Sequence, residues 1–209
     1  MNDFKLYVEV GFQHIANWNS GISFWNQLAN LPNSDHILFL FALTIRYQFA
    51  DWKKVLILVT AFTIGHSITL ALSVLNLVTY SMHWIEFLIP ITILITASSN
   101  LFVKKFVFKS KFPLIYFMAS FFGLIHGLGF SSYLKSILGK DQQIFSPLLA
   151  FNIGLELGQI VIVLIILLFS FLIVRLIKIN RREWLLFASA SVLALALKMA
   201  LDRLQNVLP

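Results

Sequence analysis

The chain has 209 residues, of which 59% are hydrophobic and only 12% are charged, and 21 of them are phenylalanine. A soluble domain of this size has no need of so much apolar surface, so the composition excludes a soluble protein and predicts a polytopic helical membrane protein. The net charge of +7 would favour nucleic-acid binding in a soluble protein, but the basic residues here form short clusters between apolar runs, which indicates membrane topology and no nucleic-acid partner.

In chain order, we expect one membrane domain over residues 1–209. Residues 1–30 alternate aromatic and polar side chains and lack the continuous apolar core of a signal peptide, which is typical of an interfacial amphipathic segment. Six apolar runs follow and predict an all-α bundle of about six transmembrane helices: residues 35–50, 55–78, 84–103, 113–134, 146–177 and 184–201. The first run is short for a span of about 20 residues, and a start near Leu28 with Pro32 in a kink would lengthen it.

The loops between these runs alternate in charge. The loops after the first, third and fifth runs are rich in basic residues: Arg46, Lys53 and Lys54, then Lys104, Lys105, Lys109 and Lys111, then Arg175, Lys178, Arg181 and Arg182. Because loops rich in Lys and Arg stay in the cytoplasm, this pattern predicts a multi-pass protein of the bacterial inner membrane with both termini outside.

Four polar motifs interrupt the apolar runs. They are Asp35-His36, Gly65-His66-Ser67, His126-Gly127 and the pair Asn152 and Glu156 four residues apart. Ionisable groups cost a few kcal/mol each within a bilayer, so their presence indicates a functional site inside the bundle. With both termini outside, all of these motifs fall in the outer half of the membrane. The small-residue pairs Gly123/Gly127 and Gly154/Gly158 would let helices approach closely and bring His126 and Glu156 onto facing surfaces.

The donor types predict a metal site. There is no cysteine, so a metal must be held by imidazole, carboxylate or carbonyl oxygen, and imidazole with carboxylate suits divalent Zn, Ni or Co. The predicted metal residues are His36, His66, His126, Asp35 and Glu156. The secondary candidates are Glu86, His14, Asn152 and Gln159. Simpler explanations also exist: Glu86 could be a solvated helix end, His14 and His83 interfacial residues, and Ser67, Asn100 and Gln159 partners in hydrogen bonds between helices.

Several of these stretches resemble the HupE/UreJ family of bacterial membrane proteins, named for association with hydrogenase and urease accessory genes. The resemblance lies in residues 11–15, 34–39, 61–67, 85–86, 122–130 and 151–159, together with Asn100. It implies a secondary permease for nickel or cobalt, with metal-associated residues at His36 with Asp35, His66, His126 and Glu156. Nickel members of this kind carry a further histidine a few residues before the Asp-His pair, whereas here the preceding histidine, His14, is 22 residues away.

Two functions of different classes fit these residues. In a permease, Asp35 and His36 would capture the cation outside, His66 and His126 would hold it, and Glu156 would neutralise charge or exchange protons. In an intramembrane zinc-dependent hydrolase, three histidines would hold the metal, and the catalytic candidates would be Glu156, Ser67 and Asn152. The scarcity of polar residues in the inner half favours the hydrolase, whereas the family resemblance favours transport. A helper that docks on another membrane protein is a third, more distant alternative.

Overall fold

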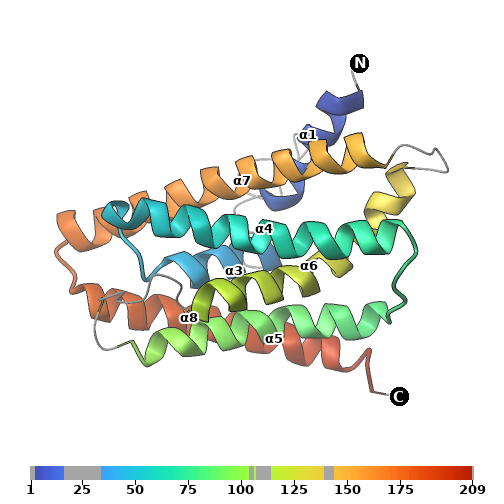
Figure 1. The fold of residues 1–209 in the computed structure, drawn as a ribbon. Helices are drawn as coiled ribbons and strands as arrows, with labels where there is room; N and C mark the ends of the chain where they lie inside the picture. Colours follow the sequence, from blue (N-terminus) through green and yellow to red (C-terminus); the bar gives the residue numbers. More distant parts are fainter. Residues whose placement is uncertain (1–2, 17–33, 104–105, 107–113, 139–143, 209) are drawn as a thin grey trace, which may run out of the picture.

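The computed structural model describes residues 3–16, 34–103, 106, 114–138 and 144–208 (Figure 1). All regular elements of these residues are helical. They are α1 (Asp3–Ala16), α3 (Asp35–Thr44), the single turn η2 (Phe49–Asp51), α4 (Trp52–Val74), α5 (Met82–Leu101), α6 (Leu114–Leu138), α7 (Phe145–Phe171), the π-helical turn η3 (Leu172–Leu176) and α8 (Arg181–Leu204). The predicted all-α membrane bundle is therefore confirmed.

Within the described residues, five helices, one fewer than predicted, are long and apolar enough to cross a membrane. They are α4 to α8, whereas the first predicted run forms only the ten-residue α3, which at about 1.5 Å per residue is half the thickness of a bilayer core. The predicted run of residues 35–50 ends early because Gln48 and Asp51 form a capping box that starts the next helix. The suggested extension toward Leu28 lies outside the described residues.

The end of α4 also differs from its predicted run of residues 55–78. Asn76 adopts a left-handed conformation with φ of 56°. The Asn76 amide then donates to the Ser73 carbonyl and the Leu77 amide to the Leu72 carbonyl, both at 2.9 Å, which is the Schellman arrangement that closes a helix. The helix therefore stops at Val74, four residues before the apolar run ends.

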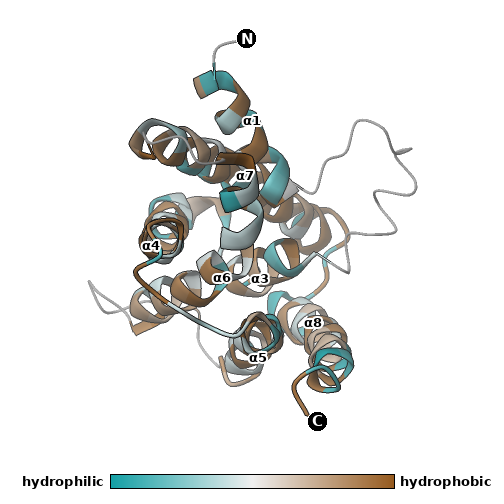
Figure 2. Ribbon diagram, turned by 90° about the vertical axis from the view of Figure 1, so that its right-hand side faces the viewer, coloured by the Kyte–Doolittle hydropathy of each residue, from teal (hydrophilic) through white to brown (hydrophobic). Residues whose placement is uncertain are grey.

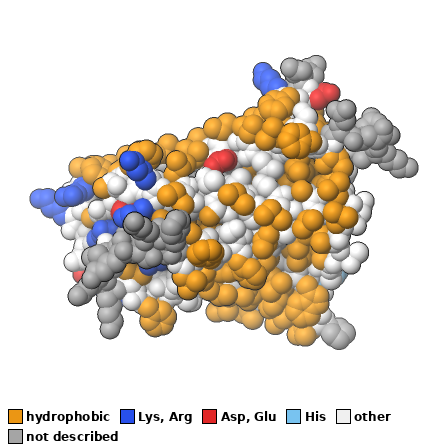
Figure 3. Space-filling model, in the orientation of Figure 1, with side chains coloured by type: hydrophobic (Ala, Val, Ile, Leu, Met, Phe, Trp, Pro, Cys, Tyr) orange, Lys and Arg blue, Asp and Glu red, His pale blue; other side chains and the backbone are white. Residues whose placement is uncertain are grey.

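The long helices lie side by side around a central short one. Figure 2 looks along the bundle and shows α3 in its middle, where it packs against α5, α7 and α8. Both termini lie at one end of the bundle in Figure 1. Lys and Arg gather mainly at the opposite end of the face in Figure 3, which we call the basic end: α4 and α8 begin there and α7 ends there.

Glycines set the two closest helix contacts. A Cβ atom at Gly123 or Gly127 of α6 would collide with the backbone carbonyl oxygen of Phe62 or His66 in α4, and one at Gly154 of α7 would collide with that of Val8 in α1. The small-residue pairs do permit close approach, as predicted. They serve different partners, however, since Gly123/Gly127 faces α4 and Gly154/Gly158 faces α1, so they do not bring His126 against Glu156.

These contacts predict that one methyl group added at Gly154 strongly weakens the packing of α1 on α7. Gly154→Ala should detach α1 from α7, because the obstacle is backbone and cannot rotate away. Amide hydrogen exchange in residues 3–16 should speed up at least about tenfold. Gly129→Ala is the matched control, since its Cβ would approach only the flexible end of Ile89. Unchanged exchange in Gly154→Ala would show that the two backbones are not in close contact.

Candidate metal centre

Three imidazoles from three helices meet inside the bundle. Each of His14, His36 and His66 offers a ring nitrogen, and these three atoms lie within 4.8 Å of one another. The centroid of the His14 ring is 4.5 Å from that of His36 and 6.0 Å from that of His66, and the His36 and His66 centroids are 6.1 Å apart. We call these residues the histidine trio.

The trio forms where two helices end inside the protein. His14 lies in the last turn of α1 and His36 in the first turn of α3, while His66 lies in the interior of the long α4. Two helix ends that meet at mid-depth can aim side chains into the bundle, as the discontinuous helices of transporters do at their binding sites. The second half of α1 packs into the bundle, because Ile15 is fully buried and Gly11 packs against α7.

The trio carries more donor atoms than its protein surroundings satisfy. Within the described part of the chain, Nε2 of His14, Nε2 of His36 and both ring nitrogens of His66 are buried without a hydrogen-bond partner. The walls are aromatic: the Phe130 ring lies tilted against that of His14 with centroids 3.6 Å apart, and the Phe151 ring stacks on that of His66 with centroids 6.4 Å apart. A buried polar atom without a partner is costly, and a bound cation would satisfy several of these nitrogens at once.

The donor set fits a borderline transition metal. Neutral imidazole suits Zn, Ni and Co, and three nitrogens at about 2.0–2.1 Å leave a fourth position open for water or another ligand. Such a tetrahedral arrangement needs nitrogens about 3.3 Å apart. To hold an ion in this way, the three nitrogens of the trio would have to approach one another from their present separations of up to 4.8 Å.

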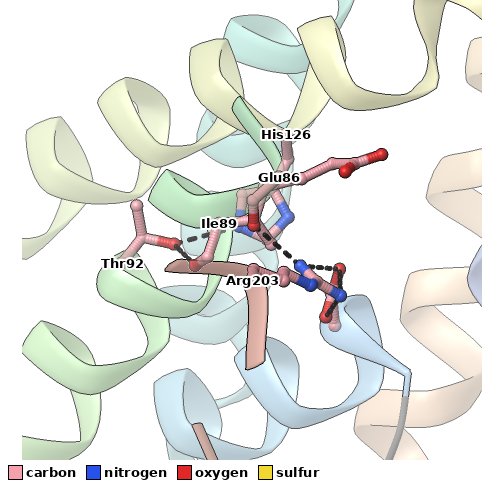
Figure 4. A network of polar contacts seen from close by, with 6 residues as sticks. Glu86, Ile89, Thr92, His126 and Arg203 are labelled. Carbon is pink, nitrogen blue, oxygen red and sulfur yellow. Dashed lines mark hydrogen bonds and ion pairs between the residues drawn. The ribbon is translucent and has the colours of Figure 1, made fainter. Parts of the chain in front are cut away.

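His126 lies beside the trio and is held by α5 (Figure 4). Its ring centroid is 5.1 Å from that of His36, and its Nε2 is 3.0 Å from the Thr92 hydroxyl oxygen. The Thr92 hydroxyl also lies 2.7 Å from the Ile89 carbonyl, and when it donates its one proton there, the His126 Nε2 is the donor to Thr92. The His126 Nδ1 is buried and has no hydrogen-bond partner among the described residues.

Asp35 points to a different partner. Both of its carboxylate oxygens accept from the Arg203 guanidinium at 3.0 Å, and Arg203 also donates to the Glu86 backbone carbonyl at 2.9 Å (Figure 4). That carbonyl is available because Pro90, four residues on, has no N–H to donate to it. Arg203 thus joins the ends of α3, α5 and α8, and Asp35 lies outside the trio. To bind a metal, Asp35 would have to leave Arg203.

This ion pair should contribute to stability. Only 18% of the Asp35 side chain and 25% of the Arg203 side chain are exposed. Asp35→Asn therefore leaves a largely buried guanidinium with one acceptor oxygen and no negative charge beside it. We expect the free energy of unfolding to fall by about 1–3 kcal/mol, measured as a lower thermal midpoint of the purified protein. Asp202→Asn, an exposed neighbour of Arg203, should change it by less than about 0.5 kcal/mol. Equal effects of the two would show that the pair contributes nothing.

A second polar group lies between α4 and α7. Thr60 donates to the Glu156 carboxylate at 2.6 Å, and Thr63 donates to the Gln159 side-chain oxygen at 2.8 Å. Thr60 precedes His66 by six residues, about 9 Å along the helix, in the direction of the basic end. Along α4, Glu156 is thus on the basic-end side of the trio and not beside it.

The other candidates fall in three places. Ser67 donates to the Thr63 carbonyl at 2.6 Å, and Asn152 donates to the Leu148 carbonyl at 2.9 Å, which are both hydrogen bonds within one helix. Glu86 contributes its backbone carbonyl to Arg203 while its carboxylate points away from that contact (Figure 4). His83 is exposed in the first turn of α5, as expected of an interfacial residue.

Residues 1–203 match the protein family described as HupE / UreJ protein. The chain belongs to this family. The match covers nearly the whole chain, so the resemblance seen in residues 11–159 is confirmed. No curated protein and no solved structure gives a significant match.

Sequence reasoning about this HupE/UreJ protein ranked one residue of the trio low and overlooked two neighbouring residues. His14 was only a secondary candidate, because it lies in a segment that was expected at the membrane interface. A signal was present: Gly11, His14 and Ile15 share one face of a helix, and the glycine allows that face to pack closely. Thr92, which contacts His126, and Arg203, which pairs with Asp35, were not considered. Two signals were present: a proline inside α5, which frees a backbone carbonyl, and an arginine in the last turn of the apolar α8.

Proposed function

We propose that this protein is a permease that moves a divalent transition metal of the nickel or cobalt type across the membrane. The observation that carries the proposal is the histidine trio, with four buried ring nitrogens that lack partners at a point where two helices end inside a membrane bundle. The metal is the transported substrate here. Membership in the HupE/UreJ family supports the same conclusion.

A polar route toward the basic end supports transport over a closed pocket. The pairs Thr63–Gln159 and Thr60–Glu156 follow the trio at one and two helical turns along α4. A carboxylate in a bilayer is costly, and one that lies about 9 Å along α4 from His66 in an apolar bundle is best explained as a point that receives a cation or exchanges a proton. Polar groups on α4 and α7 thus continue from the trio toward the basic end.

The hydrolase remains the second candidate, and it has less support. A zinc hydrolase of this kind needs a carboxylate beside the metal to activate water. No carboxylate of the described residues belongs to the trio, and the proposed catalytic side chains Glu156, Ser67 and Asn152 all bond to their neighbours on α4 or α7. Turnover by this protein would need Glu156 to move by more than one helical turn.

The direct test is uptake of metal into proteoliposomes. Vesicles that contain the purified protein should accumulate labelled nickel or cobalt faster than empty vesicles, with zinc as the third ion. Vesicles that contain a His14→Gln/His36→Gln/His66→Gln variant are the control for protein insertion. Unchanged uptake of all three ions by correctly inserted, metal-binding protein would overturn the permease and favour the enzyme.

We expect both termini to lie on the periplasmic side of the inner membrane. Both ends of the chain lie at the end of the bundle opposite the basic end (Figure 1), and basic segments stay in the cytoplasm. Reporter fusions after Lys105 and after Arg182 should give cytoplasmic signals, and a fusion at Pro209 should give a periplasmic one. A periplasmic signal at Lys105 or Arg182 would reverse the proposed direction of the polar route.

A further inference from the structure

A cavity of about 140 Å³ lies at the basic end, far from the histidine trio. Its walls come from the turn after α3, the end of α7 with η3, and the start of α8. We propose that this cavity binds the headgroup of an anionic phospholipid in the membrane leaflet at the basic end. We call it the headgroup cavity. The proposal does not depend on what the protein transports.

Two guanidinium groups give the headgroup cavity its charge. Arg175 and Arg181 line it, and no Asp or Glu of the described residues does. Guanidinium presents several N–H donors in a planar fork, which matches the oxygens of a phosphate. Basic pockets between transmembrane helices on the cytoplasmic side are suited to anionic headgroups for this reason.

Contacts fix the Arg181 side chain, and the backbone places Arg175 on the wall of the same cavity. Arg181 donates to the Arg46 carbonyl at 2.8 Å, and its guanidinium lies 3.8 Å from the centre of the Phe106 ring, so its position is fixed on two sides. Arg175 belongs to the π-helical turn η3, where the Ile177 amide reaches back five residues to Leu172. The wider π-helical turn and the left-handed conformation of Lys178 end the helix beside the start of α8. The cavity is the space between these two helix ends.

The rest of the cavity fits a lipid better than free phosphate. Phe49, Phe171 and Leu167 form an apolar wall, and the Phe49 and Phe171 rings, both partly exposed, lie 6.0 Å apart. The Trp184 indole donates to Ser170 at 3.0 Å and fixes the inner boundary. A volume of 140 Å³ is too small for a whole lipid or a drug-sized ligand, so the cavity would hold one headgroup while the acyl chains follow the apolar helices outside.

The test uses the purified full chain in detergent without added metal. Native mass spectrometry should detect phosphatidylglycerol on the protein at concentrations where phosphatidylcholine does not bind, and phosphatidylglycerol should raise the thermal midpoint. Arg175→Gln should weaken phosphatidylglycerol binding about fivefold, because one basic group near an anionic surface contributes about 1 kcal/mol. Arg175 is exposed, so this variant should fold normally.

Controls separate the cavity from general surface charge. Lys178→Gln removes one positive charge three residues away without altering the cavity lining, and it should bind phosphatidylglycerol like the original protein. Equal losses in the two variants, or no loss in Arg175→Gln, would overturn the proposal. Equal stabilisation by inorganic phosphate at matched concentration would overturn the assignment to a lipid, because it would show that the acyl chains contribute nothing.

Discussion

Replacement of His66 by alanine is expected to abolish high-affinity binding of nickel, cobalt or zinc while the bundle stays folded. His66 is fully buried and both its ring nitrogens lack partners among the described residues, so it is the trio member with the most unused donor capacity. Loss of one of three ligands should weaken binding by at least about 100-fold, more than the 10- to 100-fold typical of residues that only orient a ligand. Titration calorimetry on purified, chelator-treated protein measures this directly.

The folded state should survive the change. Alanine leaves a small cavity but also removes two unsatisfied polar atoms, and these effects oppose each other. We expect the thermal midpoint of the metal-free protein to shift by less than about 5 °C. His83→Ala, which removes an exposed histidine in α5, should leave both metal affinity and the midpoint unchanged. Full metal affinity in His66→Ala would exclude the trio as the binding site.

Glu156→Gln should stop transport and spare binding. Glutamine still offers Thr60 an oxygen to donate to, so the contact between α4 and α7 is kept while the charge is lost. Because the carboxylate lies about two turns beyond His66 and outside the trio, metal affinity should change less than about threefold. Uptake into proteoliposomes should fall at least about tenfold, because a cation that leaves the trio no longer meets a negative charge inside the bilayer.

The control for this variant is Glu183→Gln. Glu183 is exposed in the first turn of α8, so its neutralisation removes the same charge without touching the route. Uptake by Glu183→Gln should match that of the original protein. If Glu156→Gln transports normally, Glu156 is a structural partner of Thr60 and the proposed route is wrong. If Glu156→Gln loses metal affinity as strongly as His66→Ala, the carboxylate is a ligand that joins the trio when metal is bound.

Most of the fold could be predicted from hydrophobicity alone. Runs of 18 or more apolar residues have one stable state in a bilayer, so α4 to α8 agree with their predicted runs to within a few residues. The short helices could not be predicted in this way. The first run read as a span because apolar residues continue to Ala50, but the chain turns at the Gln48/Asp51 capping box, which a hydropathy average does not detect.

The candidate site was predicted by residue type better than by arrangement. Histidines inside apolar runs pointed to His36 and His66, and the structure brings both together. The group whose ring nitrogens lie within 4.8 Å of one another also contains His14, because the glycine contact between Gly154 and α1 carries His14 into the bundle, while His126 lies beside this group. Contacts between elements so far apart in sequence have no local signature. For the same reason the partners of Asp35 and Glu156 became visible only in the folded chain.

X-ray absorption spectroscopy of the purified protein loaded with one equivalent of nickel or cobalt tests the central claim most directly. The account predicts a single bound ion per chain with three imidazole nitrogens in its coordination shell, and loss of that signature in each of His14→Gln, His36→Gln and His66→Gln. A coordination shell without imidazole, or one that is unchanged when any of these three histidines is replaced, would contradict it.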